Sequence, residues 1–139
     1  MKKIVAELGC QRVRIGCSPF WRCLETSSAI AKALGVNNVT LEYEFGEVLL
    51  DNLYEENPVP HLKTNQTLDL GNGITFEQSA TSDWSCLGNE FPETWFEFQK
   101  RFEAGVKLVK DRLNAQTEQV EAEIMVCHGA QQEVIPMFC

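Results

Sequence analysis

Two short motifs place polar side chains directly after apolar segments of this chain. The alternating segment 12–17 is followed by Ser18 and then by Arg22, and the apolar segment 123–127 runs into His128. The start of a helix attracts anions, and an arginine there adds a planar fork for two oxyanion oxygens. An imidazole can donate to the same oxyanion or move a proton near neutral pH. Together these residue types predict an anion site.

Each residue also has a plainer interpretation. Arg22 would then be a solvated residue on a helix surface, and His128 a hydrogen-bonded histidine of the core. A shared site is favoured because parallel strands bring their carboxyl ends to one edge of a sheet. A separation of Arg22 and His128 well beyond about 10 Å, which one phosphate cannot span, would exclude it.

The elements that must position these residues alternate between helix and strand. Apolar residues at every second position indicate strands, and apolar residues three or four apart indicate helices. Ser18 is expected to cap the helix that follows it, with Pro19 in the first turn and Gly35 as the stop. In chain order the sequence predicts a helix at 2–8, a strand at 12–17, a helix at 20–34, a strand at 39–43, a helix from Pro92 to Leu113, a strand at 123–127 and a helix start within 131–138.

This alternation predicts an α/β fold, a three-layer sandwich with a mostly parallel sheet. The length of 139 residues suits a single domain over 1–139. The segment 45–89 carries two prolines and a Gly-Asn-Gly turn, and we expect it to be a long irregular loop on the substrate side.

Composition excludes several functional classes. The net charge of −8 argues against a nucleic-acid surface but allows a local anion site. No segment approaches the roughly 18–20 apolar residues of a membrane span, and the start of the chain lacks a signal peptide's apolar region. We therefore expect a cytoplasmic protein that binds neither nucleic acid nor membranes.

The cysteine pattern favours reduced thiols over disulfides or a metal site. Without a secretion signal, the six cysteines are expected to be free, and several lie in apolar strand or helix contexts. No two cysteines have zinc-ligand spacing, and the two histidines, His61 and His128, are far apart in sequence. We expect neither a metal nor another cofactor.

Three segments together resemble the histidine phosphatase superfamily, which has the phosphoglycerate mutase-like fold. Residues 17–34, "CSPFWRCLETSSAIAKAL", resemble its "S-P-x-x-R-C/A-x-x-T-A" segment, and 123–130, "EIMVCHGA", resemble its second strand-H-G motif. Residues 91–109 are similar to its helix that begins near "P-E-S" and continues with "F-x-x-R". The branch related to the ubiquitin-associated SH3 phosphatases is the most similar, because its segment also contains "S-P-x-x-R-C".

The resemblance implies specific roles. Arg22 would bind the phosphate of a phosphomonoester, and His128 would bind and polarise it. The family's proton donor is an acid after the next strand, which is Glu47 here, with Glu44 as the alternative. Such a donor needs a raised pKa. A plain surface acid remains the other interpretation of Glu47.

The family's nucleophilic histidine has no counterpart in this sequence. It lies in an "R-H-G" motif after the first strand, and His61, the only other histidine, lies in the middle segment. The resemblance therefore implies an incomplete, truncated domain, a phosphatase-like hydrolase without activity. The alternative is a non-catalytic pseudoenzyme that binds phosphorylated small molecules, phosphoproteins or other proteins. A missing central strand would also expose apolar sheet edges, so we expect poor solubility or a homo-oligomer.

Overall fold

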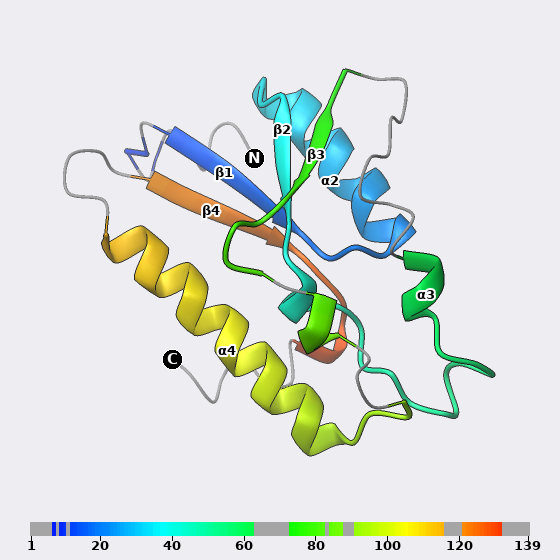
Figure 1. Ribbon diagram of the computed structural model, residues 1–139. Helices are drawn as coiled ribbons and strands as arrows, with labels where there is room; N and C mark the ends of the chain where they lie inside the picture. Colours follow the sequence, from blue (N-terminus) through cyan, green and yellow to red (C-terminus); the bar gives the residue numbers. More distant parts are fainter. Residues whose placement is uncertain are drawn as a thin grey trace.

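A parallel sheet forms the centre of the structure, a computed structural model that describes residues 7, 9–10, 12–62, 73–82, 84–87, 91–115 and 121–131 (Figure 1). Its four strands lie in the order β3-β2-β1-β4, and every neighbouring pair is parallel. The strands are β1 (Arg12–Cys17), β2 (Asn38–Leu41), β3 (Thr75–Gln78) and β4 (Glu121–Val126). The helices are α2 (Trp21–Leu34), α3 (Val59–Leu62) and α4 (Trp95–Asn114), with short 3-10 turns at Tyr43–Phe45 and Trp84–Cys86. The predicted α/β class with a parallel sheet is confirmed.

The two long helices lie on opposite faces of the sheet (Figure 1). Neighbouring residues of a strand point to opposite faces. Val126 of β4 belongs to the core that includes Leu24 of α2, whereas its neighbour Met125 packs against the cluster that Phe98 and Phe102 of α4 form. Each helix thus buries its own apolar stripe against one side of the strands that end at the candidate site.

The direct pairing of β1 with β4 leaves no gap between the two strands that carry the motifs. Six residue pairs join them, from Arg12–Glu121 to Cys17–Val126. Their carboxyl ends are therefore held side by side, because the backbone ladder runs along the whole of β1. Among the described helices, none is long and apolar enough to cross a membrane.

In α2 the predicted stripe of buried apolar residues is confirmed, but the predicted N-terminal cap is not. Cys23, Leu24 and Ala31 are buried, and Gly35 ends the helix with φ +78°. That left-handed conformation suits glycine, which has no Cβ. Phe20 holds the N-cap position and no side chain caps the helix, so the capping role expected of Ser18 is wrong.

Two predictions for the middle of the chain are also wrong. The second strand ends at Leu41, not at residue 43, because the backbone turns into a 3-10 helix at Tyr43–Phe45. The segment 45–89 is not wholly irregular, because it contains β3, which pairs with all four residues of β2. Only Phe76 of β3 is buried, so backbone pairing rather than an apolar pattern identifies this strand.

Thr94 rather than Pro92 marks the start of the clearest helix. The Thr94 hydroxyl accepts from the Glu97 N–H, and the Glu97 carboxylate accepts from the Thr94 N–H, which is a capping box. Of the helix predicted at 2–8 only Glu7 is described, and it is helical. The helix start predicted within 131–138 lies outside the described residues after Gln131.

The carboxyl-terminal half of α4 is tied to the sheet through a buried charge cluster. Arg112 forms ion pairs of 2.9 Å with Glu42 and 2.5 Å with Glu123, and both carboxylates are almost fully buried. Burial raises the pKa of Glu42 to about 7, although Arg112 lowers it, and Glu123 and Glu44 add repulsion. Glu42 therefore titrates near neutral pH in the folded protein.

Raising the pH is therefore expected to destabilise the protein through Glu42. The ordinary pKa is 4.5 and the folded one about 7, so the folded state binds more protons than the unfolded state between these values. The free energy of unfolding should fall by about 1–3 kcal/mol across this interval. Urea unfolding at pH 5 and pH 8 measures this change, and Glu42→Gln should flatten it. Parallel pH profiles for the two proteins would contradict the assignment.

Candidate functional site

Arg22, His128 and Glu47 meet at the carboxyl ends of β1 and β4. Nη2 of Arg22 lies 2.8 Å from Nδ1 of His128 and 2.9 Å from Oε2 of Glu47. Oε2 of Glu47 lies 3.2 Å from the same Nδ1. Arg22 and His128 are therefore in direct contact, well within the roughly 10 Å that one phosphate could span, and Glu47 lies against both of them.

The structure also assigns Ser18 a place in this site. The Ser18 hydroxyl lies 2.8 Å from Nε2 of His128, on the far side of the imidazole from Arg22 and Glu47. Ser18 follows β1 directly and its N–H donates to the carbonyl of Val126, so both strands fix its position. The ring of Phe20 meets the imidazole edge-on at 5.0 Å, which restricts rotation of the histidine.

Hydrogen bonding restricts the protonation of His128. If Arg22 donates to Nδ1, that nitrogen carries a lone pair, and the proton of a neutral ring is then on Nε2 and donates to Ser18. A protonated ring instead donates to Ser18 through Nε2 and to Glu47 through Nδ1. A neutral ring with its proton on Nδ1 would instead accept from the Ser18 hydroxyl at Nε2, so in each case this hydroxyl orients the imidazole.

Arg22 is held in its charged form while much of its side chain faces water. Burial lowers the pKa of the guanidinium, but hydrogen bonds and charge interactions with Tyr54 and Glu47 outweigh it and raise the pKa. The Arg22 side chain is 56% exposed, whereas that of Glu47 is 15% exposed. A ligand can therefore reach Arg22 from solvent, with Tyr54 beside it.

The pKa of Glu47 moves opposite to the direction that a proton donor needs. Burial raises this pKa, but His128, the Val48 N–H and Arg22 together lower it below the ordinary value. Glu47 is therefore ionised at neutral pH in this arrangement. The raised pKa expected from the resemblance is absent, because the contacts with His128, the Val48 N–H and Arg22 outweigh burial.

Arg101 positions the segment that carries Glu47. Its buried guanidinium donates two hydrogen bonds to the Glu93 carboxylate, at 2.9 and 2.7 Å. It also donates to the carbonyls of Glu44, Gly46 and Glu47 at 2.9, 3.1 and 3.0 Å. The Arg101 side chain thus binds three carbonyls of the turn, and the Glu93 carboxylate, just before α4, balances its positive charge.

Gln131 joins that turn to the histidine segment. Its side-chain carbonyl accepts from the His128 N–H at 3.0 Å, and its amide donates to the carbonyls of Phe45 and Gly46. Gln131 is fully buried. Through Arg101 and Gln131, the backbones that carry Glu47 and His128 are fixed relative to each other.

The alternative acid and the second histidine lie outside this site. Glu44 is buried and accepts a hydrogen bond from Ser82, and its Cβ faces Gly105 of α4. His61 lies in α3 with a 76% exposed side chain, and its Nε2 is 3.5 Å from Oε1 of Glu56. Glu47 rather than Glu44 is therefore the acid near Arg22, and His61 does not supply a nucleophile beside His128.

The thiol nearest the site is not reactive. Sγ of Cys23 lies 3.6 Å from Nε2 of His128, and burial raises the pKa of this thiol to about 11. A thiolate is the nucleophilic form, so Cys23 acts as packing here. No disulfide joins any two of the five described cysteines, and the described residues contain no His, Cys, Asp or Glu cluster able to hold a metal.

The sequence carried partial signals for the site residues that it did not identify. Arg101 belongs to the "F-x-x-R" pattern of the predicted helix, but its partners lie more than fifty residues away in the turn at 44–47. Gln131 follows the H-G motif by two residues, and Tyr54 belongs to no motif.

No protein-family model and no curated protein matches this chain.

Proposed function

We propose that the Arg22–His128–Glu47 site binds the phosphate of a phosphomonoester. The observation that supports this most is the 2.8 Å contact of Arg22 with His128, because it brings a guanidinium and an imidazole together beside the Glu47 carboxylate. A guanidinium fork and an imidazole N–H suit the oxygens of a phosphate. The resemblance to the histidine phosphatase superfamily assigns the same residues to that task.

The position of the Glu47 carboxylate, in contact with both Arg22 and His128, also supports the proposal. Its Oε2 is within 2.9 Å of Arg22 and 3.2 Å of His128, so an oxyanion already occupies the position between the two donors. In this proposal the phosphate displaces Glu47. The displaced carboxylate then loses its contacts with Arg22 and His128 and lies beside a dianion, which raises its pKa. Only in that state would Glu47 suit the role of proton donor to the leaving oxygen.

We propose phosphate binding without covalent phosphoryl transfer for these 139 residues. Transfer through a phosphohistidine needs a second histidine at the phosphate, and His61 is exposed on α3. The function is therefore that of a phosphatase-like domain with negligible hydrolysis, which holds a phosphorylated small molecule or phosphoprotein. We place this function in the cytoplasm.

The Ser18–His128–Glu47 chain suggests a second reaction class, hydrolysis by an activated serine. The distances of 2.8 Å and 3.2 Å satisfy the spacing of a hydroxyl, an imidazole and a carboxylate in such enzymes. Ser18, however, is 0% exposed, so a substrate carbonyl cannot approach its oxygen. Phosphate binding is favoured because Arg22, unlike Ser18, is open to solvent.

Calorimetric titration with inorganic phosphate tests the proposal. Arg22→Gln should weaken binding at least tenfold, because it removes the guanidinium that contacts the His128 imidazole and the Glu47 carboxylate. Lys32→Gln, which removes one exposed positive charge from the same helix, is the matched control and should change the affinity less than twofold. Equal affinities for the two variants would refute the site.

An activity assay separates the binding and enzymatic interpretations. We expect no turnover of p-nitrophenyl phosphate above background. Turnover that His128→Ala abolishes would establish an enzyme and contradict the proposed inactivity. Labelling of Ser18 by a fluorophosphonate probe would instead favour the serine mechanism.

A further inference from the structure

The strands β1 and β2 are paired only at their carboxyl ends. The ladder joins Gly16 to Thr40 and Cys17 to Leu41, and no pair joins residues 12–15 of β1 to β2. β2 itself pairs with β3 along all four of its residues, and β1 pairs with β4 along all six. The two strands separate toward their amino ends, as Figure 1 shows. This separation opens a space within the sheet, at the opposite end of β1 from Arg22 and His128.

That space is a cavity of about 430 Å³. Its volume falls in the range of small-molecule sites, roughly 300–1,000 Å³. Residues 12–15 of β1 form one wall, and residues 36–38 and Thr40 form the other. Among the described residues that line the cavity, none is acidic and two are arginines. This described lining is therefore positively charged, whereas the net charge of the protein is −8.

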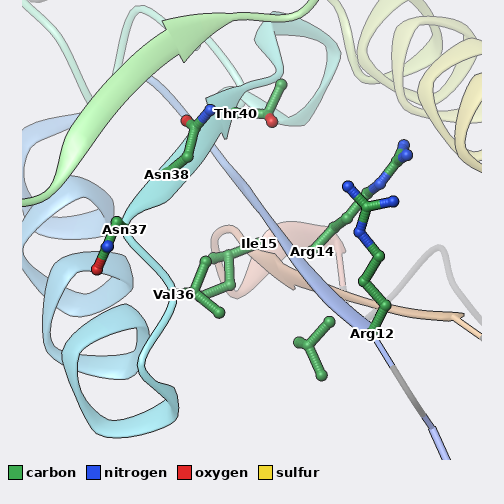
Figure 2. A pocket seen from close by; sticks show the side chains of 8 residues that line it. Arg12, Arg14, Ile15, Val36, Asn37, Asn38 and Thr40 are labelled. Carbon is green, nitrogen blue, oxygen red and sulfur yellow. The ribbon is translucent and has the colours of Figure 1, made fainter.

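Two arginines dominate the chemistry of the β1 wall. Arg12 and Arg14 are two residues apart on one strand, so their side chains leave the same face about 7 Å apart. Figure 2 shows both extending in the same direction. An anion beside the two guanidiniums would be attracted by both and could accept hydrogen bonds from both planar forks.

The β2 wall adds neutral polar groups and an apolar base. Asn37, Asn38 and Thr40 supply amide and hydroxyl groups, and Asn38 is fixed by a 2.9 Å hydrogen bond to Glu77 of β3. Ile15 of the β1 wall and Val36 of the β2 wall supply the apolar part of the lining (Figure 2). A ligand of matching chemistry carries charged oxygens at one end and hydrogen-bonding groups at the other.

The neighbouring acids on β4 determine how much charge the ligand needs. Arg12 lies opposite Glu121 in the ladder, and Arg14 lies opposite Glu123. Glu123 is already bound by Arg112 at 2.5 Å. The Glu123 carboxylate, on the strand beside Arg14, opposes an anion in the cavity. A ligand with two or more negative charges competes better than a singly charged one.

We propose that this cavity binds a small multiply charged anion, of the class of phosphorylated polyols and polycarboxylates, through Arg12 and Arg14. The site is distinct from the Arg22–His128–Glu47 site and does not depend on it. The two sites lie at opposite ends of β1.

Amide-resolved NMR titration of the full chain tests the proposal, with inorganic pyrophosphate and citrate as separate probes. We expect at least one probe to shift the backbone amides of Arg14, Asn37 and Asn38. Saturation by pyrophosphate alone would assign a phosphorylated ligand, and saturation by citrate alone a carboxylated one. If neither probe shifts these amides, the proposal is wrong.

Two double variants identify the groups responsible. Arg12→Gln/Arg14→Gln should weaken the probe's affinity at this cavity at least tenfold, whereas Lys107→Gln/Lys110→Gln, an equal loss of charge on α4, should change it less than twofold. Arg14→Lys keeps the charge without the fork and should give an intermediate affinity, with the fold verified by the amide spectrum. Arg22→Gln should leave the cavity shifts unchanged. Probe shifts confined to Arg22 and His128 would overturn this proposal while leaving the first site intact.

Discussion

Replacing Arg101 by methionine is expected to lower the free energy of unfolding by about 3–5 kcal/mol. The variant would leave the Glu93 carboxylate buried without its cation and would remove the donors to three carbonyls of the turn at 44–47. Both side chains of the pair are less than 10% exposed, so water does not replace the lost partner. Urea unfolding followed by circular dichroism measures the loss.

Two further variants show whether the geometry of Arg101 or only its charge is needed. Arg101→Lys keeps the charge but cannot form the five contacts of the planar fork, so a loss of about 2 kcal/mol should remain. Lys100→Met, an exposed neighbour on α4, should change stability by less than about 1 kcal/mol. A loss for Arg101→Met as small as that of Lys100→Met would show that Arg101 does not hold the turn.

The clearest parts of the fold were predictable because their signals are local. Period-two alternation identified β1 over its full length, and helical spacing identified the buried stripe of α2. The order of these elements sufficed to predict that Arg22 and His128 meet at the carboxyl ends of parallel strands. Their 2.8 Å contact follows from the β1–β4 ladder, which no local pattern encodes.

The remaining features depend on contacts between distant segments. β3 has one buried side chain, so only its ladder with β2 distinguishes it from a loop. Ser18 has a typical capping residue type, but it bonds to a histidine 110 residues away. The pKa of Glu47 is likewise set by Arg22 and His128, so the sequence could nominate the acid but not its protonation state.

Glu47→Gln is expected to strengthen the binding of an oxyanion at Arg22 and His128 by about tenfold, or about 1.4 kcal/mol. In the unliganded protein the Glu47 carboxylate contacts both donors, so an incoming anion must break those contacts and then lie beside a negative charge. Glutamine has the same shape without the charge. It therefore lowers both the free energy needed to break the contacts with Arg22 and His128 and the repulsion of the bound anion. Sulfate is the suitable probe because it remains a dianion throughout the accessible pH range.

Glu25→Gln is the matched control, because it removes an exposed acid from α2 near Arg22 and changes the net charge equally. Its affinity for sulfate should increase less than twofold. Weaker binding by Glu47→Gln than by the unmodified protein would show that Glu47 supports the anion rather than competes with it. Stronger binding would mean that a proton on Glu47 has the same effect as the substitution. Phosphate binding and proton uptake at Glu47 would then be linked, which is the condition under which this carboxyl could donate a proton to a leaving oxygen.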